Sequence, residues 1–439
     1  MKTKEEFKQI VSDSLWQHIR KNGYLPPDNT EGRNQFCERI YNLITNREYH
    51  PSLPREYVIA DKHNGSTRLI PVFTLDDTAV YYYCVKALED YLAEGYVDCT
   101  FGGFRLNGKI TDQENNLFNE INAMPVYGSE FSYNPTGWVN AWRGFQYKAF
   151  QISREEGLNY FVSLDIGNFY PSINLALLEN KIRNSADKSL SDEIDLLFYF
   201  LKYWDRKIAF YSPRGVGIPM DDFGDSSRLL ANFFLQEYDR KVYDYCQNNG
   251  AKYLRFADDQ VICTPDKAVA DKIIRFASLE LSRIGLYVNS GKIKRFDTRN
   301  KFEKYWAFEI FIKLDQQETL EEGIKDYLSA DKNNIRWVSV LRRIIGRDLN
   351  NIDLALKSSV FAQVFDPEFL TKCGHRELLK LYGLLDTDRE KNTFLNTLQR
   401  VASECLYTEF HYSILVAKNK GLPITFEEEI RERINELRF

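Results

Sequence analysis

The chain has 439 residues, of which 44% are hydrophobic and 28% charged, a composition that excludes a disordered or fibrous protein and allows about two to four compact domains. Its formal net charge of -5 excludes a uniformly basic nucleic-acid-binding surface, so that any phosphate binding must use local patches. The 27 Tyr, 30 Phe and 6 Trp can serve buried cores or base stacking, and composition does not separate the two uses.

The cysteines indicate reduced thiols, the histidines argue against a zinc site, and the N-terminus lacks an export signal. Seven scattered cysteines form no C-x-x-C pair, and five histidines show no metal-ligand spacing, which argues against disulfides and against a zinc site. The first residues, MKTKEEFKQI, contain no apolar segment of a signal peptide, and no apolar run is long enough to span a membrane. We therefore expect a cytoplasmic protein without a membrane span.

In the first half of the chain the sequence predicts a helix, a hairpin and a long segment without regular secondary structure. Apolar residues at helical spacing predict one helix from about residue 5 to 20. The segment 57–73 predicts a hairpin whose turn is His63-Asn64-Gly65-Ser66. Residues 111–137 are polar and rich in Pro and Gly, which predicts a long irregular insertion.

Three apolar runs then alternate with helical patterns, which is typical of an α/β or α+β core. The runs are 160–166, 252–263 and 304–314, and each is expected to contain strand. From about residue 333 to the end the periodicity is helical, with breaks at Gly374, Gly383 and 421–423. This last region is expected to hold five or six helices.

Carboxylates at strand ends are the strongest chemical signal. The chain contains three Asp-Asp pairs, at 76–77, 221–222 and 258–259, so the pair alone says little. Asp258-Asp259 is distinctive because it lies between two apolar arms, where buried charge is costly unless something binds it. An ordinary polar turn is the alternative, although such turns favour Asn-Gly or Asp-Gly. Asp165 follows another apolar run and could face the same cleft.

Four segments in order resemble the palm motifs of reverse transcriptases. VSLDIGNFYPSI (162–173) resembles motif A, GVGIPMDDFGDSSRLLANFFL (215–235) motif B, YLRFADDQVIC (253–263) motif C and IGLYVNSGKIKR (284–295) motif D. Upstream, the stretch 66–71 resembles the first fingers motif and 101–105 the second. The resemblance covers about residues 55–310.

This resemblance implies an α+β protein with a right-hand polymerase palm and fingers, the palm being ferredoxin-like. An all-α, helical-repeat-like domain takes the place of a thumb at the C-terminus. The expected divisions are 1–55 as an N-terminal helical segment, 56–160 as fingers with the insertion, 161–315 as palm and 316–439 as the all-α domain.

The implied activity is DNA polymerisation from dNTPs by two Mg²⁺ ions, for which Mn²⁺ can substitute. Asp165 and Asp258 would hold both ions, with the Ile166 carbonyl and Asp259 completing or supporting the metal site. Lys292 would assist departure of pyrophosphate, unless it is a surface lysine in a basic run. Tyr170 occupies the position of the steric gate that excludes a ribose 2′-hydroxyl, unless it is a core aromatic. The other expected nucleotide-binding residues are Arg68, Arg105, Phe169, Pro219, Arg228 and Asn289.

Motif B departs from the templated pattern, because Pro219-Met220-Asp221 stands where Pro-Gln-Gly is usual. Acidic Asp221, Asp222 and Asp225 would also repel a template phosphate. The end of motif B, Ser227-Arg228 followed by Leu230-Ala231-Asn232, and the all-helical C-terminal region look more like those of bacterial defence-associated and abortive-infection reverse transcriptases. This resemblance implies homo-oligomers and DNA synthesis without a template from a protein hydroxyl. Tyr127 and Tyr133 are candidate priming residues.

Two other functions stay open. One is a retron-like reverse transcriptase that copies a partner non-coding RNA, and the other is a silent RNA-binding scaffold that has kept the palm. The joint presence of the carboxylates, Lys292 and Tyr170 argues against the scaffold. An RNA-dependent RNA polymerase is disfavoured by Ala257, where glycine is usual, and by Tyr170.

Overall fold

The computed structural model describes residues 1–22, 24–61, 67–103, 105–106, 137–205, 208–209, 212–213, 217–220 and 225–438. The described chain forms two compact units, one of residues 1–55 and 71–299, the other of residues 56–70 and 300–439. The expected irregular insertion and the turn of the first hairpin lie outside the described residues, apart from Gly137 at the start of a helix. No described helix is long and apolar enough to cross a membrane.

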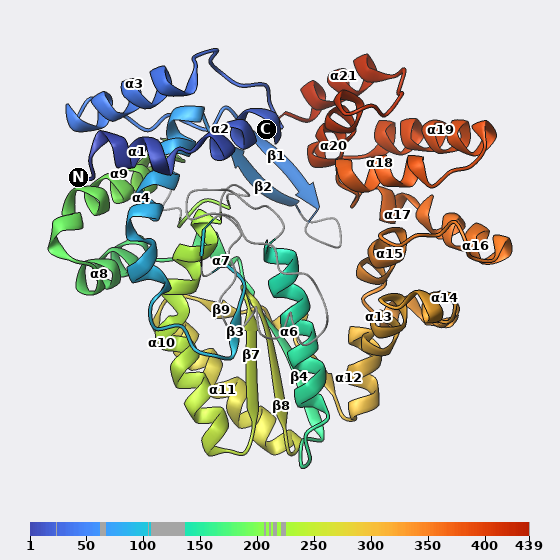
Figure 1. Ribbon diagram of the computed structural model, residues 1–439. Helices are drawn as coiled ribbons and strands as arrows, with labels where there is room; N and C mark the ends of the chain where they lie inside the picture. The colour runs from blue at the N-terminus through green and yellow to red at the C-terminus, as the bar shows by residue number, and fades with distance from the viewer. Residues whose placement is uncertain are drawn as a thin grey trace. The chain divides into compact units, whose positions relative to one another are not determined.

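The first unit surrounds one mixed sheet (Figure 1). Its strands are β3 (Thr100–Phe101), β4 (Tyr160–Gly167), β7 (Lys252–Phe256), β8 (Asp259–Thr264), β9 (Tyr287–Val288) and β10 (Lys294–Phe296). The order across the sheet is β10-β4-β8-β7-β3, and β9 also pairs with β4. β8 lies antiparallel between β4 and β7, so β4 and β7 run in the same direction without touching. This is the split βαβ arrangement of the predicted ferredoxin-like palm.

Helices of the first unit pack on this sheet and on one another, and they bury many aromatic residues. They are α1 (Lys4–Ile10), α2 (Asp13–Asn22), α3 (Arg33–Thr45), α4 (Leu75–Ala93), α6 (Gly137–Ser153), α7 (Phe169–Ser172), α8 (Leu175–Ser185), α9 (Ser191–Tyr203), α10 (Ser226–Asn248) and α11 (Lys267–Arg283). The short strands β5 (Ile208–Ala209) and β6 (Ser212–Pro213) pair with each other. α4 packs on α9 and α10, and its consecutive Tyr81, Tyr82 and Tyr83 are all buried. Much of the aromatic content is therefore core.

The second unit consists of a hairpin and a succession of helices. The hairpin pairs β1 (Glu56–Asp61) with β2 (Thr67–Val72), as predicted, although the last two residues of β2 belong to the first unit. The helices are α12 (Arg299–Trp306), α13 (Phe308–Leu314), α14 (Leu320–Ser329), α15 (Trp337–Ile345), α16 (Leu354–Val364), α17 (Pro367–Leu370), α18 (His375–Gly383), α19 (Asp388–Glu404), α20 (Thr408–Asn419) and α21 (Glu427–Leu437). Neighbouring helices pack on one another, which fits the predicted all-α, repeat-like region.

The hairpin is tied to the end of the chain by specific bonds. The Ile59 N–H donates to the Thr408 hydroxyl of α20 at 2.8 Å. Glu56, which is buried, accepts from the Tyr412 hydroxyl and, at 3.2 Å, from Arg438. β1 therefore packs as part of the C-terminal helical unit.

Two predicted elements are wrong. The single helix over 5–20 is two helices, because the Ser12 hydroxyl accepts from the Leu15 N–H at 3.2 Å and begins a new helix. The run 304–314 is helical rather than a strand. Phe302, one helical turn before Trp306, is buried with it, and Ala307 has a φ of 55° that separates α12 from α13. A short apolar run suits a buried helix as well as a strand, so periodicity did not distinguish them.

Candidate active site

The pairing of β4 with β8 brings the predicted carboxylates together. Asp165 on β4 lies directly opposite Asp259 on β8. Asp258 precedes β8 in the turn that leaves β7, and its carbonyl accepts from the Ile166 N–H at 3.3 Å. The motif A aspartate and both motif C aspartates thus share one end of the central strand pair.

The motif C turn is strained and electrostatically crowded. Ala257 has a φ of 51°, a left-handed conformation that costs a non-glycine residue about 1–2 kcal/mol. Burial, followed by the neighbouring carboxylates of Asp259 and Asp165, raises the pKa of Asp258 to about 7. A cation placed among these carboxylates would relieve the same repulsion.

Motif D supplies polar partners to the motif A aspartate. The Asn289 N–H donates to the Asp165 carbonyl at 2.8 Å, and its side-chain amide donates to the Asp165 carboxylate at 3.0 Å. The Lys292 ammonium lies 3.2 Å from the same carboxylate. β9 pairs with β4 immediately beyond, at Ile166 and Gly167, so motif D is docked against motif A.

The donor set fits divalent cations in its chemistry. Carboxylate oxygens are the ligands that Mg²⁺ prefers, and three carboxylates meet here. In the described part of the chain no group of three or more His, Cys, Asp or Glu side chains is already arranged to hold a metal ion. Asp165 instead faces Lys292 and Asn289, which neutralise and orient it. Asp165 and Asp258 would hold the ions, and Ile166 and Asp259 stay predicted as further ligands.

Tyr170 lies on the short helix α7 that follows β4. Asn168, with a φ of 52°, turns the chain from the strand into this helix. Phe169 is buried and its ring lies 5.3 Å from that of Tyr170. Burial raises the pKa of Tyr170, whereas Arg228 beside the phenol lowers it. The ring is thus held between motif A and motif B.

Motif B is bound to α7 through its backbone. The Ile218 N–H donates to the Tyr170 carbonyl at 3.1 Å, and the Gly217 N–H donates to the Pro171 carbonyl at 3.0 Å. A Cβ on Gly217 would lie 2.2 Å from the Tyr170 oxygen, so only glycine permits this approach. Pro219, the next predicted contact residue, is buried beside this segment.

Gly217→Ala is therefore expected to lower the free energy of unfolding by about 1–3 kcal/mol, because the methyl group meets backbone atoms that cannot move aside. Urea denaturation measures the change. Gly32→Ala is the matched control, since its added Cβ would meet nothing within 4 Å, and its effect should stay below about 1 kcal/mol. Equal effects of the two substitutions would contradict the close approach.

The second fingers motif joins motif B through two glycines. Gly102 and Gly103 have φ values of 80° and 76°, and Cβ atoms there would collide with Phe256 and with Arg228. The paired glycines, which depart from the family pattern, are thus required by this local packing. Arg228 forms an ion pair with Asp225. The Asp225 charge is therefore offset, which removes one of the three acidic residues expected to repel a template; Asp221 and Asp222 lie outside the described residues.

Residues 60–310 match the family described as reverse transcriptase (RNA-dependent DNA polymerase). The match spans more than half of the chain, on the same strands that carry the carboxylates. The chain belongs to the reverse transcriptase family. No curated protein matches it.

Telomerase structures resemble this reverse transcriptase at low similarity. Apo telomerase from Candida tropicalis, truncated from its C-terminal domain, has 12% identity and a TM-score of 0.35 over 62% of this chain and 58% of that chain. Telomerase from Candida albicans, in complex with a TWJ fragment of telomeric RNA, has 11% identity and a TM-score of 0.36 over 89% of this chain and 71% of that chain. Such TM-scores carry no argument about substrate or partner. The family match establishes a nucleotidyltransferase of the DNA polymerase type in general.

The other predicted residues of this reverse transcriptase fall into three groups. Arg105 pairs with Asp90 of α4 at 2.7 Å, and its contact with the nucleotide stays a prediction. Arg68 is half-buried on β2 in the second unit. Tyr127 and Tyr133 lie outside the described residues.

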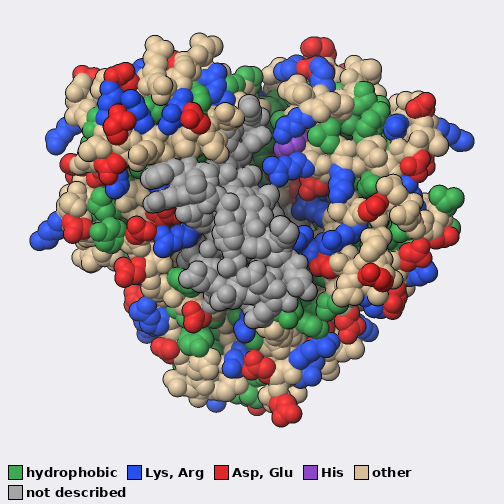
Figure 2. All heavy atoms as spheres, in the orientation of Figure 1, with side chains coloured by type: hydrophobic (Ala, Val, Ile, Leu, Met, Phe, Trp, Pro, Cys, Tyr) green, Lys and Arg blue, Asp and Glu red, His purple; other side chains and the backbone are tan. Residues whose placement is uncertain are grey.

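The sequence contains two basic clusters that could bind phosphate, and their arginines mostly pair within the protein: Lys292, Lys294 and Arg295, and Arg342, Arg343 and Arg347. Arg295 pairs with Asp271 at 2.5 Å. Arg343 and Arg347 both pair with Asp315, and Arg342 donates to the Lys372 carbonyl. These contacts, made with residues outside the helix, fit an ordinary helix face at 342–347 better than a phosphate-binding patch. Figure 2 shows acidic and basic side chains interspersed over the described part of the visible face.

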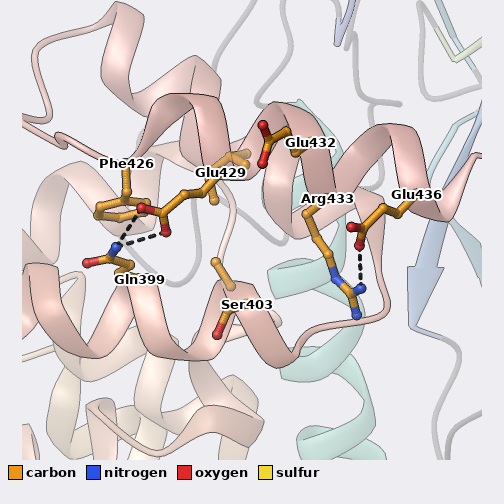
Figure 3. Close-up of a pocket in the computed structure, with 9 residues that line it drawn as sticks. Gln399, Ser403, Phe426, Glu429, Glu432, Arg433 and Glu436 are labelled. Atoms are coloured by element: carbon orange, nitrogen blue, oxygen red, sulfur yellow. Dashed lines mark hydrogen bonds and ion pairs between the residues drawn. The ribbon is translucent and has the colours of Figure 1, made fainter.

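A pocket in this reverse transcriptase lies apart from all predicted site residues in the sequence. It has a volume of about 160 Å³ and is lined by residues of α19 and α21 together with Phe426 (Figure 3). Gln399 donates to Glu429 at 2.8 Å and Arg433 pairs with Glu436 at 2.8 Å, while the buried Nε of Arg433 has no hydrogen-bond partner among the residues that the structure describes. The chemistry of the carboxylates, rather than this hollow, identifies the candidate active site.

The sequence reasoning missed one group at the site, the side chain of Arg255. It is fully buried directly beneath the motif C turn. The available signal was a charged residue inside the apolar arm YLRF, where burial requires partners.

Proposed function

We propose that the cluster of Asp165, Asp258 and Asp259 adds deoxynucleotides to a 3′-hydroxyl with two bound Mg²⁺ ions. The observation that carries the proposal is the register of β4 and β8, which sets Asp165 opposite Asp259 with Asp258 in the adjoining turn. Bound divalent ions would supply activation of the attacking hydroxyl and neutralisation of the leaving pyrophosphate. Mn²⁺ is expected to substitute for Mg²⁺.

The surrounding residues take distinct roles in this proposal. Asn289 orients the Asp165 carboxylate through its amide, at 3.0 Å. Lys292 is 41% exposed, so its ammonium can leave Asp165 and accompany the charge that builds on pyrophosphate. Tyr170 would bar a 2′-hydroxyl by excluded volume, and therefore select dNTPs. The residues proposed to contact or support the nucleotide are Arg68, Arg105, Phe169, Pro219 and Arg228.

We further propose that synthesis depends little on an added template and that the DNA begins on a protein side chain. Pro219-Met220-Asp221, the net charge of -5 and the helical region at the C-terminus support this. In the priming step a tyrosine phenol oxygen bonds to the α-phosphorus of a dNTP. The α–β phosphoanhydride bond breaks, pyrophosphate leaves, and the phenol proton passes to water. Tethering raises the effective concentration of the 3′-end to about millimolar. Tyr127 and Tyr133 are the proposed primers.

Nuclease-treated protein incubated with labelled dNTPs and Mg²⁺ is expected to carry label through a denaturing gel until DNase removes it. The same label should be missing from a Tyr127→Phe, Tyr133→Phe double variant if either phenol is the primer. Label that arises only when RNA and a free primer are added would contradict the proposal. That outcome would favour the templated alternative, in which the enzyme copies a partner non-coding RNA, as the family description allows.

A role in bacterial defence against phage is proposed from the motif resemblance. Cells that carry the wild-type chain should plate phage less efficiently than cells that carry Asp165→Ala. We also propose a homo-oligomer, which light scattering on the purified protein would detect.

A further inference from the structure

Arg255 is a fully buried arginine on β7, three residues before Asp258. Its guanidinium donates to Asp239 at 2.7 and 2.6 Å, to the Asn232 side-chain oxygen at 2.8 Å and to the Ala257 carbonyl at 2.7 Å. An arginine fork can hold several acceptors in one plane, which a lysine cannot do. One side chain thus joins a helix, a strand and a turn.

The ion pair beneath the turn is buried on both sides. Asp239, on α10, is 2% exposed, and its carboxylate also accepts from the Tyr253 hydroxyl at 2.9 Å. Burying such a pair adds little net stability, because desolvation cancels most of the attraction. A specific geometry is therefore a better explanation of this arginine than stability alone.

The hydrogen bond from Arg255 to the Ala257 carbonyl is made to a residue with a strained backbone conformation. Ala257 has a φ of 51°, and such a conformation persists only where the surroundings hold it. The Arg255 bond fixes the Ala257 carbonyl, and the next two residues are Asp258 and Asp259. The Arg255 hydrogen bond, on the buried side of the turn, consequently orients the carboxylates of Asp258 and Asp259.

The same guanidinium is linked to the fingers motif. Asn232, which is 1% exposed, donates its amide to the carbonyls of Gly102 and Gly103 at 2.5 and 3.2 Å. Its oxygen accepts from Arg255. The chain of bonds therefore runs from the glycine turn, through Asn232 and Arg255, to the motif C turn.

We propose that Arg255 is a positioning residue, which holds Asp258 and Asp259 ready for divalent ions and couples their turn to Gly102-Gly103 through Asn232. The inference rests on the proposed function of these aspartates. Loss of residues that hydrogen-bond to and orient metal ligands changes metal affinity or activity by about 10–100-fold, which sets the expected scale.

The test compares Arg255→Lys with Tyr238→Phe. Lysine keeps the charge for Asp239 but cannot also reach Asn232 and Ala257. Tyr238→Phe removes a different buried bond of α10, its 2.7 Å contact with Gln260, and leaves the arginine intact. Three quantities are measured for each protein: Mn²⁺ affinity by electron paramagnetic resonance, Tm by thermal unfolding, and the rate of nucleotide incorporation.

Arg255→Lys is expected to weaken Mn²⁺ binding by about tenfold or more. Tyr238→Phe is expected to keep the Mn²⁺ affinity within about twofold of wild type, although it lowers the Tm by a similar amount. Equal Mn²⁺ affinities in the two variants would overturn the proposal. Wild type that binds Mn²⁺ but incorporates nothing would instead count against the proposed function alone, since the binding comparison stays valid.

If Arg255→Lys does not fold, Asn232→Ala carries the test, because it removes one acceptor of Arg255 without leaving a charge unpaired. It is expected to weaken Mn²⁺ binding by a smaller factor than the lysine variant, about threefold to tenfold. Unchanged Mn²⁺ affinity in a folded Asn232→Ala protein would overturn the coupling.

Discussion

Asp165→Ala and Asp258→Ala are each expected to abolish nucleotide incorporation, by at least about 10³-fold, while the protein stays folded. Each change removes a carboxylate from the pair that would hold both ions, a larger loss than that of one electrostatic donor. Folding should survive because the change also relieves repulsion among the neighbouring carboxylates. Burial first, and then the charges of Asp259 and Asp165, raise the pKa of Asp258 to about 7. Incorporation of labelled dNTPs and thermal unfolding are the two measurements.

Asp195→Ala is the matched control for this first prediction. Its carboxylate pairs with Arg183 at 2.6 Å on the exposed surface of α9, outside the cluster. It should keep wild-type incorporation. The Tm of each of the three variants should differ from that of wild type by no more than about 3 °C. Full incorporation activity in Asp165→Ala or Asp258→Ala would rule out the candidate site.

Tyr170→Val is expected to admit ribonucleotides that the wild-type protein rejects, with a loss of discrimination of about 10²-fold. The gate would act through the volume of its ring, held by Phe169 and by motif B. Competition between labelled dNTP and rNTP under single-nucleotide incorporation gives the ratio of kcat/KM values.

Tyr170→Phe separates the ring from the phenol. It keeps the volume and loses the interaction with Arg228, so it should retain selectivity for dNTPs. If the valine variant discriminates as wild type does, Tyr170 serves packing. If the phenylalanine variant loses selectivity, the hydroxyl rather than the volume is responsible.

The palm could be predicted from sequence because its signals are local. Asp165 lies near the end of β4 and Asp258-Asp259 lies where β7 turns into β8, and β4 and β8 pair in the register that brings them together. The hairpin over 56–72 was likewise marked by its Asn-Gly turn. By contrast, the apolar run 304–314 suited either a strand or a helix, and only packing with Phe302 decided it.

Contacts between distant residues could not be predicted in the same way. The pairing of Arg105 with Asp90, and of Arg343 and Arg347 with Asp315, neutralises arginines that a sequence presents as available. Arg255 is the clearest case, since three of its four bonds reach α10. A charged residue in an apolar segment indicates that it has buried partners, but the sequence does not identify which residues they are.

The attachment of β1 to α20 bears on how this protein could be shortened or recombined. The C-terminal helices cannot be exchanged as a separate unit, because Thr408 binds the Ile59 amide and Arg438 binds the Glu56 carboxylate, and both partners belong to a strand encoded before the palm. A deletion after residue 299 would strip the fingers hairpin of its support and leave Glu56 without these partners. Cutting the gene into domains by sequence order would therefore separate pieces that fold as one body.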